Sequence, residues 1–284
     1  MALPSRSDEG LRVVLGPSRH EGVRWLEREP YYVAGADEIP IFERCHAHGL
    51  AVMLKGPTGC GKTRFVEHMA WRLQRPLVTV ACHDDLSASD LTGRYLVRGG
   101  ETVWQDGPLT LAARLGALCY LDEIVEARQD TVVVIHPLAD DRRILPVDKA
   151  GELVPAAPGF QLVVSYNPGY QHLLKDLKPS TRQRFVALDF DFLAPEAEAA
   201  IVAHEGGVEA PTARALVQLG GRLRLLRDRG LAEVPSTRLL VATARLVAGG
   251  IPIADACRVA LLAPLTDDPD LLSGMRDLVS ASLG

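Results

Sequence analysis

The chain has 284 residues, 47% of them hydrophobic, which is enough for one large or two modest domains with proper cores. No apolar run reaches the roughly 20 residues of a membrane helix, and the start lacks a signal-peptide core, so we expect a cytoplasmic protein with no membrane partner. A net charge of −5 disfavours nucleic acid as a partner, and five scattered cysteines without a C-x-x-C pair disfavour a disulfide framework or structural zinc.

The N-terminal residues 1–30 are rich in arginine and glutamate and show little periodicity. We expect an arm that packs onto or extends the main domain. His46 and His48 follow it on an expected helix, where alternate residues point to different sides. A shared metal ion is therefore disfavoured, and surface or packing roles are expected.

Short apolar runs alternate with helical segments between residues 31 and 193. Such runs are typical of a parallel sheet that is buried on both faces and has helices as crossovers. The pattern predicts an α/β fold with strands at 50–54, 77–81, 118–121, 162–166 and 185–188.

Two inserted segments, 93–104 and 143–154, have the pattern of β-hairpins. The first turns at Gly99-Gly100 and the second near Ala150-Gly151. Neither shows an apolar face suited to a core, so we expect both to project and to contact a partner, with ordinary surface hairpins as the alternative.

Strand signals stop at Pro195, and glycine and proline breaks divide the rest into four or five expected helices. The sequence therefore predicts three parts: the arm 1–30, an α/β nucleotide-binding part 31–193 and an all-helical part 194–284.

A complete phosphate-loop motif, G-x-x-x-x-G-K-[ST], lies between the first expected strand and a helix. In such a loop, backbone N–H groups surround the phosphates, the lysine adds charge, and the last hydroxyl ligates Mg²⁺. The following helix directs its N-terminal dipole at the same place. We expect ATP to bind here rather than a chance glycine-rich turn, through Gly56, Pro57, Thr58, Gly59, Cys60, Gly61, Lys62 and Thr63.

Adjacent carboxylates, Asp122 and Glu123, end a second expected strand. Beside a phosphate loop, Asp122 would hold Mg²⁺ together with Thr63, and Glu123 would deprotonate the attacking water. Without the loop, the pair would be an ordinary solvated strand end or helix cap.

Further polar residues follow other strands or begin a helix. Asn167 ends the strand 162–166 and could hold the lytic water or contact the γ-phosphate. Arg182 and Arg184 precede the last strand, and Arg238 lies in the first turn of a helix capped by Ser236. A guanidinium can stabilise charge on the γ-phosphate, in cis or from a neighbouring subunit, although each arginine alone could be a surface ion-pair partner.

The order of these elements resembles the AAA+ ATPases over about residues 31–262, and the places of the two hairpins are similar to the MoxR branch. The strings 89–95, 103–110, 121–128 and 174–185 resemble the CbbQ/NirQ/NorQ subfamily, most closely CbbQ. The resemblance implies a P-loop AAA+ parallel sheet with a helical lid. It also implies that Asn167 is a sensor, Arg182 or Arg184 an arginine finger, and Arg238 a second sensor.

The same resemblance implies a hexameric ring that works as a chaperone with a partner carrying a von Willebrand factor A (VWA) domain. ATP hydrolysis in the ring would remodel a metabolic enzyme. We favour Rubisco, freed of inhibitory sugar phosphates, as the client, and maturation of a nitric oxide or nitrite reductase is the alternative. A nucleic-acid motor and a metal-chelatase motor subunit are further alternatives.

Overall fold

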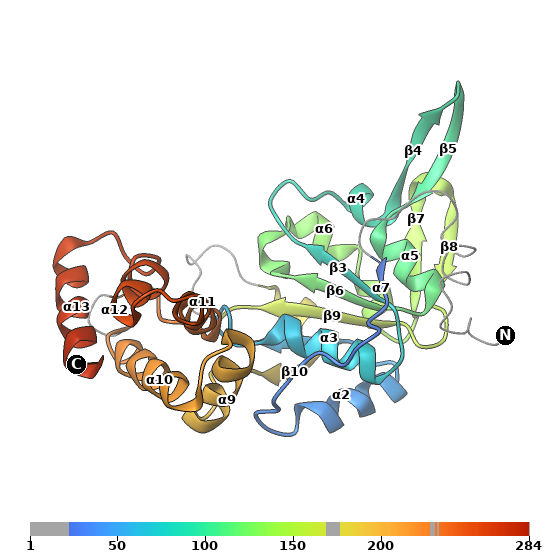
Figure 1. Cartoon of the computed structure of the whole chain (residues 1–284). Helices are drawn as coiled ribbons and strands as arrows, with labels where there is room; N and C mark the ends of the chain where they lie inside the picture. Colours follow the sequence, from blue (N-terminus) through green and yellow to red (C-terminus); the bar gives the residue numbers. More distant parts are fainter. Residues whose placement is uncertain (1–22, 169–176, 228–230, 232, 284) are drawn as a thin grey trace.

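The computed structural model describes residues 23–168, 177–227, 231 and 233–283. Within these residues, six strands form a central sheet in the order β1-β3-β6-β9-β2-β10. Figure 1 labels β3, β6, β9 and β10 of this sheet. All strands of the sheet run parallel except β1, which pairs antiparallel with β3 at one edge. The strands are β1 Val23–Arg24, β2 Val52–Lys55, β3 Leu77–Ala81, β6 Leu118–Asp122, β9 Gln161–Tyr166 and β10 Val186–Asp189.

The five strands expected from the apolar runs are all present, so the α/β prediction is confirmed. Strand β1 was not predicted. It adds the end of the N-terminal arm to the sheet, while residues 1–22 of that arm lie outside the described residues, as do residues 174–176 of the string 174–185.

Helices cover both faces of the sheet. Because side chains alternate along a strand, Leu118 and Tyr120 face α2 (Glu38–Ala47) and α3 (Lys62–Arg72), whereas Cys119 and Leu121 face α5 (Pro108–Leu115). The remaining helices before residue 183 are α4 Ala88–Thr92, α6 Gln129–Val133, α7 His136–Ala139 and α8 Pro179–Arg182, with 3-10 turns at Ile124–Glu126 and Asp148–Ala150.

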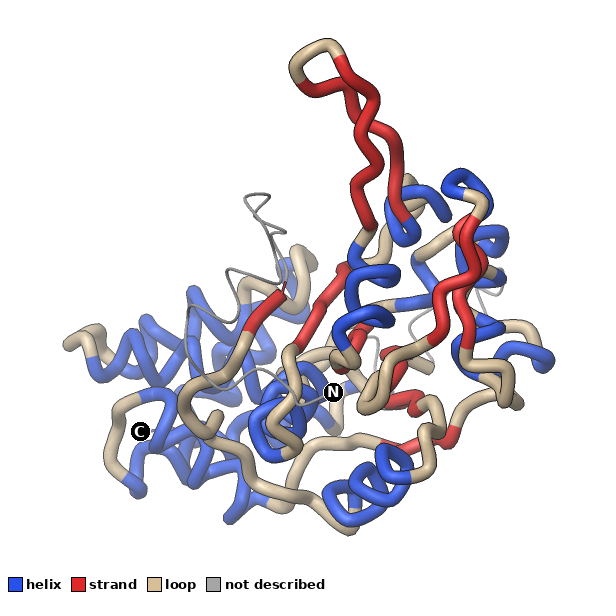
Figure 2. Tube along the Cα trace, turned by 90° about the vertical axis from the view of Figure 1, so that its right-hand side faces the viewer, coloured by secondary structure: helices blue, strands red, loops and turns tan. Residues whose placement is uncertain are grey.

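Both inserted segments form hairpins, but they differ in burial. Strands β4 (Gly93–Arg98) and β5 (Glu101–Asp106) extend away from the body (Figure 2), and Tyr95 and Val97 on β4 are 52% and 77% exposed. Strands β7 (Ile144–Val147) and β8 (Glu152–Pro155) pack against α5 and α7 instead, and Leu145, Val147 and Val154 are buried in the hydrophobic core on that side of the sheet.

The expectation that neither hairpin has a core-facing apolar side is therefore wrong for the second one. Alternation along β7 and β8 does give it such a face, and only its turn projects.

A second lobe is built from helices (Figure 1): α9 Pro195–Gly206, α10 Ala210–Arg224, α11 Thr237–Ala248, α12 Ile253–Ala256, a π-helix Cys257–Leu262 and α13 Pro269–Leu283. It has its own apolar core, around Leu216, Leu240 and Leu261. A buried ion pair ties α9 to α10: both oxygens of Glu198 accept from the Arg224 guanidinium, at 2.8 and 2.6 Å. We call this lobe the lid.

Candidate active site

The predicted phosphate loop connects β2 to α3. Two positions of the loop must be glycine because other parts of the chain lie too close for a side chain. A Cβ on Gly56 would lie 2.2 Å from the carbonyl oxygen of Phe190, and one on Gly59 would lie 2.5 Å from Cβ of Ser236. Gly61 caps α3 in the left-handed conformation, with φ of 106°, and a Cβ there would meet open space. The loop therefore leaves room above the N-terminus of α3.

Lys62 is the buried cation of this loop, with 7% of its surface exposed. Its ammonium donates to the carbonyl oxygens of Gly56 and Pro57, at 2.7 and 2.8 Å, and to Oδ1 of Asn167 at 2.7 Å. Burial lowers the pKa of Lys62, and the charges of Asp122 and Glu123 act in the opposite direction. The lysine is thus held between the first part of the loop and the end of β9.

The two acidic residues lie at the carboxyl end of β6, where the sequence predicts them. The Asp122 carboxylate accepts hydrogen bonds from the hydroxyls of Tyr120 and Ser165, at 2.7 and 2.6 Å. Glu123 is exposed, and its φ of 56° is left-handed, a conformation that costs a non-glycine residue about 1–3 kcal/mol. Its backbone N–H donates to Ser165 at 2.7 Å, which holds this turn in place.

The end of β9 brings Asn167 into the same group. Besides accepting from Lys62, Asn167 donates from Nδ2 to the hydroxyl of Thr58 at 3.1 Å. Because β2, β6 and β9 are parallel neighbours, their carboxyl ends meet at one edge of the sheet. The loop, the acidic pair and Asn167 are therefore assembled together.

The lid supplies Arg238 to this edge. Ser236 caps α11 by accepting from the backbone N–H of Leu239, and Cβ of Arg238 is 3.5 Å from the position that a Cβ of Gly59 would take. The first turn of α11 thus lies directly on the phosphate loop.

Arg182 and Arg184 lie elsewhere. Val186 pairs with Val52 and Asp189 with Lys55, so Arg184 precedes the amino end of β10, whereas the loop follows the carboxyl end of β2. Four strand residues, at about 3.3 Å each, separate the two edges. Nε of Arg184 lies 3.7 Å from Oδ2 of Asp140, whose pKa is lowered to about 2, mainly by hydrogen bonds from Arg142. The structure does not bring these arginines to the loop of their own chain.

Contacts between lid and body include several residues that the sequence patterns did not indicate. The rings of Tyr31 and His204 stack with centroids 3.8 Å apart. Glu205 on α9 pairs with Arg64 of α3 at 3.2 Å, and within the lid it also pairs with Arg245 of α11 at 3.2 Å. These residues are far apart in the sequence, so no local pattern could have paired them.

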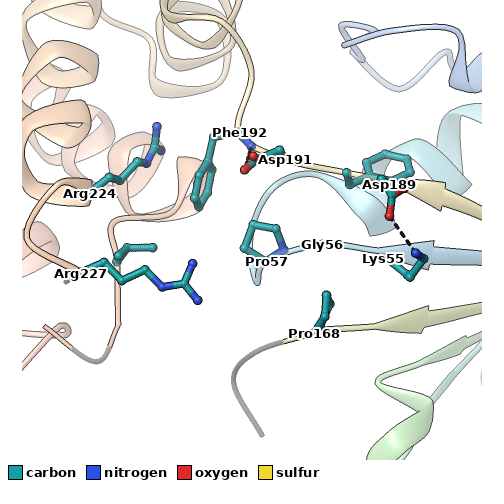
Figure 3. Close-up of a pocket in the computed structure, with 11 residues that line it drawn as sticks. Lys55, Gly56, Pro57, Pro168, Asp189, Asp191, Phe192, Arg224 and Arg227 are labelled. Carbon is teal, nitrogen blue, oxygen red and sulfur yellow. Dashed lines mark hydrogen bonds and ion pairs between the residues drawn. The ribbon is translucent and has the colours of Figure 1, made fainter. Parts of the chain in front are cut away.

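A cavity of about 320 Å³ lies beside the loop, between the strand ends and the lid (Figure 3). Gly56, Pro57 and Pro168 line it on the body side, and Arg224 and Arg227 on the lid side. The lysine and the carboxylates of the expected site do not line it. This cavity therefore adjoins the predicted phosphate site without being that site.

The residues present fit a nucleotide with Mg²⁺. A buried cation and a helix N-terminus suit phosphate groups. The hydroxyl of Thr63 and the carboxylate of Asp122 both neighbour the phenol of Tyr120, so two oxygen ligands of the kind that Mg²⁺ prefers lie close together.

His46 has a packing role, since its Nδ1 lies 2.9 Å from Oε1 of Gln161. In the described part of the chain, no helix is long and apolar enough to cross a membrane.

Comparison with known proteins gives two family matches. Residues 51–185 match the AAA domain (dynein-related subfamily), and residues 198–282 match the CbbQ/NirQ/NorQ C-terminal family, so the similarity extends beyond residue 262. Protein CbbQ of Hydrogenophilus thermoluteolus is 61% identical over 251 residues, which cover 88% of this chain and 94% of that protein.

Two further relatives are similar to the same degree. Protein NorQ of Paracoccus denitrificans is 60% identical over 255 residues, 90% of this chain and 94% of that protein. The denitrification regulatory protein NirQ of Pseudomonas aeruginosa is 60% identical over 250 residues, 88% of this chain and 96% of that protein.

Proposed function

The chain belongs to the CbbQ/NirQ/NorQ family of AAA ATPases, and from this premise we propose that it is the ATP-driven motor of a protein-remodelling chaperone. The observation that carries the proposal is the hairpin β4–β5. It extends from the body (Figures 1 and 2), and Tyr95 and Val97 on it are exposed to solvent. The expected ATP site lies elsewhere, where Ser236 of the lid approaches Gly59 of the phosphate loop. An exposed apolar surface of this kind suits contact with another protein.

We assign the chemistry to the residues at the carboxyl edge of the sheet. The loop Gly56–Thr63 holds the phosphates, and Thr63 and Asp122 hold Mg²⁺, which neutralises phosphate charge when it is bound. Glu123 accepts a proton from the attacking water, and Asn167 orients that water or contacts the γ-phosphate. Arg238, on the lid, adds a positive charge on the opposite side of the loop.

The proposal includes a ring of six subunits in which Arg182 or Arg184 acts on the neighbour's nucleotide. The position of both arginines supports this, because each lies at the edge of the sheet away from its own phosphate loop. A guanidinium supplied by the next subunit would stabilise charge that develops on the γ-phosphate.

We propose Rubisco inhibited by sugar phosphates as the client, with a VWA-domain protein as adaptor. The identity to NorQ and NirQ is 60% in each case, so maturation of a nitric oxide or nitrite reductase is the second candidate. Both candidates use the same motor and differ only in what the adaptor delivers.

A reconstitution with each adaptor and client tests this proposal. The chain, a VWA-domain protein and ATP are added to inhibited Rubisco, and carboxylation is followed with time. The Glu123→Gln variant is the control, because it keeps the assembly but stops ATP hydrolysis. Reactivation with the wild-type chain, but not with the Glu123→Gln variant, supports Rubisco as the client. Failure here, together with ATP-dependent activation of a nitric oxide reductase, would replace the client and leave the motor in place.

A further inference from the structure

Two buried hydroxyls organise the acidic end of β6. Tyr120 and Ser165 are each 0% exposed, and both donate to the same atom, Oδ1 of Asp122, at 2.7 and 2.6 Å. Ser165 in turn accepts the backbone N–H of Glu123 at 2.7 Å. In the described part of the chain, Oδ2 of Asp122 accepts no hydrogen bond. One carboxylate oxygen is therefore occupied, and the other remains for a ligand.

The alternation of strand residues places these groups together. Tyr120 precedes Asp122 by two residues and so lies on the same face of β6, toward α3. On the neighbouring strand, Val163 pairs with Tyr120 and faces α3 as well, so Ser165, two residues later, lies on that face too. Helix α3 begins with the phosphate loop residues Lys62 and Thr63.

The phenol of Tyr120 also reaches the loop, because it neighbours the hydroxyl of Thr63. The phenol donates its own proton to Oδ1 of Asp122 at 2.7 Å. A hydroxyl that ligates a cation must direct its own proton elsewhere, and the phenol oxygen lies within reach to accept it from Thr63.

We propose that Tyr120 is a positioning residue that holds Thr63 and Asp122 in the relative arrangement needed for Mg²⁺, and that Ser165 fixes Glu123 to the same carboxylate. The proposal rests on the assignment of Thr63 and Asp122 as the Mg²⁺ ligands. Groups that orient metal ligands typically change metal affinity by roughly 10- to 100-fold when they are removed.

A purely structural role is the competing explanation, since a buried phenol needs a hydrogen-bond partner in any protein. Such a role would change stability but not the dependence of nucleotide binding on Mg²⁺. The test therefore measures ADP binding by the full-length chain at a series of Mg²⁺ concentrations, and ADP is used because it is not turned over.

Tyr120→Phe removes one oxygen and leaves the ring in the core. We expect the variant to need a roughly tenfold higher Mg²⁺ concentration to reach half of the Mg²⁺-dependent increase in ADP affinity. The ADP affinity measured without Mg²⁺ should change by less than about twofold. Ser165→Ala should shift the Mg²⁺ dependence in the same direction and also lower kcat. It keeps the test valid if Tyr120→Phe folds poorly.

Thr110→Val is the matched control. It removes a hydroxyl that is also 0% exposed and donates to the carbonyl oxygen of Thr92 at 2.6 Å, away from the acidic residues. It should lower the melting temperature without shifting the Mg²⁺ dependence. Asp122→Asn is the reference that removes the negative charge of the assigned ligand itself.

If Asp122→Asn shifts the Mg²⁺ dependence and neither Tyr120→Phe nor Ser165→Ala does, the positioning role is wrong and the assignment of Asp122 stands. If Asp122→Asn itself leaves the Mg²⁺ dependence unchanged, the assignment fails, and the positioning role fails with it.

Discussion

Nζ of Lys62 lies 2.7 Å from Oδ1 of Asn167, so the cation of the phosphate loop is held by the residue that ends the neighbouring strand. A phosphate group bound in the loop would compete for this lysine. Asn167 would then be released toward the γ-phosphate and the attacking water. The pair thus links occupation of the loop to the position of a residue expected to act in hydrolysis.

Asn167→Ala should consequently separate binding from catalysis. We expect kcat for ATP hydrolysis to fall roughly 100-fold because a donor to the reacting groups is lost. ADP affinity should change by less than about threefold, since the hydrogen bond lost to Lys62 is replaced by phosphate. Steady-state kinetics and ADP titration check both expectations. A variant with wild-type kcat would show that Asn167 does not act on the reacting groups.

Glu123→Gln should stop hydrolysis while ATP still binds. The amide can lie near the water but cannot accept its proton, so we expect kcat to fall roughly 10²- to 10⁴-fold with little change in nucleotide affinity. Lys62→Ala should weaken binding itself. Glu126→Gln, three residues further along, is the control for loss of a carboxylate. Turnover by Glu123→Gln at the wild-type rate would refute the role of this residue.

Arg184→Ala, and Arg182→Ala if that residue is the finger, should abolish hydrolysis with much less effect on nucleotide affinity. The guanidinium lies at the edge of the sheet away from its own loop, so it would act on the neighbour's transition state. Mixing Arg184→Ala with Lys62→Ala subunits tests this directly. One supplies an intact pocket and the other an intact finger, so ATPase activity should recover in part once subunits exchange. No recovery under exchange would exclude action in trans.

Removal of the apolar surface of β4–β5 should uncouple ATP hydrolysis from remodelling. Val97→Ser changes a side chain that is 77% exposed, and deletion of residues 98–101 shortens the hairpin further. We expect assembly and ATPase rates to be retained and client activation to be lost. Leu153→Ser, at a position 65% exposed on β8, is the matched control on the second hairpin. Undiminished client activation by both β4–β5 variants would argue against contact through this hairpin.

Glu198→Gln should destabilise the lid. The Glu198 side chain is 1% exposed and accepts from the Arg224 guanidinium and from the hydroxyl of Thr237. Loss of one partner of a buried ion pair costs about 3–5 kcal/mol, because the other charge is left without compensation. Asp255→Asn breaks an exposed pair with Arg258 and should cost less than about 1 kcal/mol. Denaturant unfolding of both variants measures the difference, and equal stabilities would contradict the buried-pair argument.

Much of this protein could be predicted from local patterns. Apolar runs gave the five parallel strands, and a motif of eight residues gave the phosphate loop. Because parallel strands present their carboxyl ends at one edge, the sequence also indicated that Asp122 and Asn167 would lie near that loop. The glycine and proline breaks after Pro195 also predicted the helical lid, because the ends of helices depend on residues that are close in the sequence.

Other features depend on residues that are distant in the sequence, and only the tertiary structure decided them. The burial of Leu145 and Val154 on the second hairpin required helices α5 and α7, against which this hairpin packs. The approach of Ser236 to Gly59 depends on how the lid lies against the loop. Asp122 accepts one hydrogen bond from Tyr120 on its own strand and one from Ser165 on the neighbouring strand. Strand register decides which side chains of two strands meet, and a single sequence does not state the register.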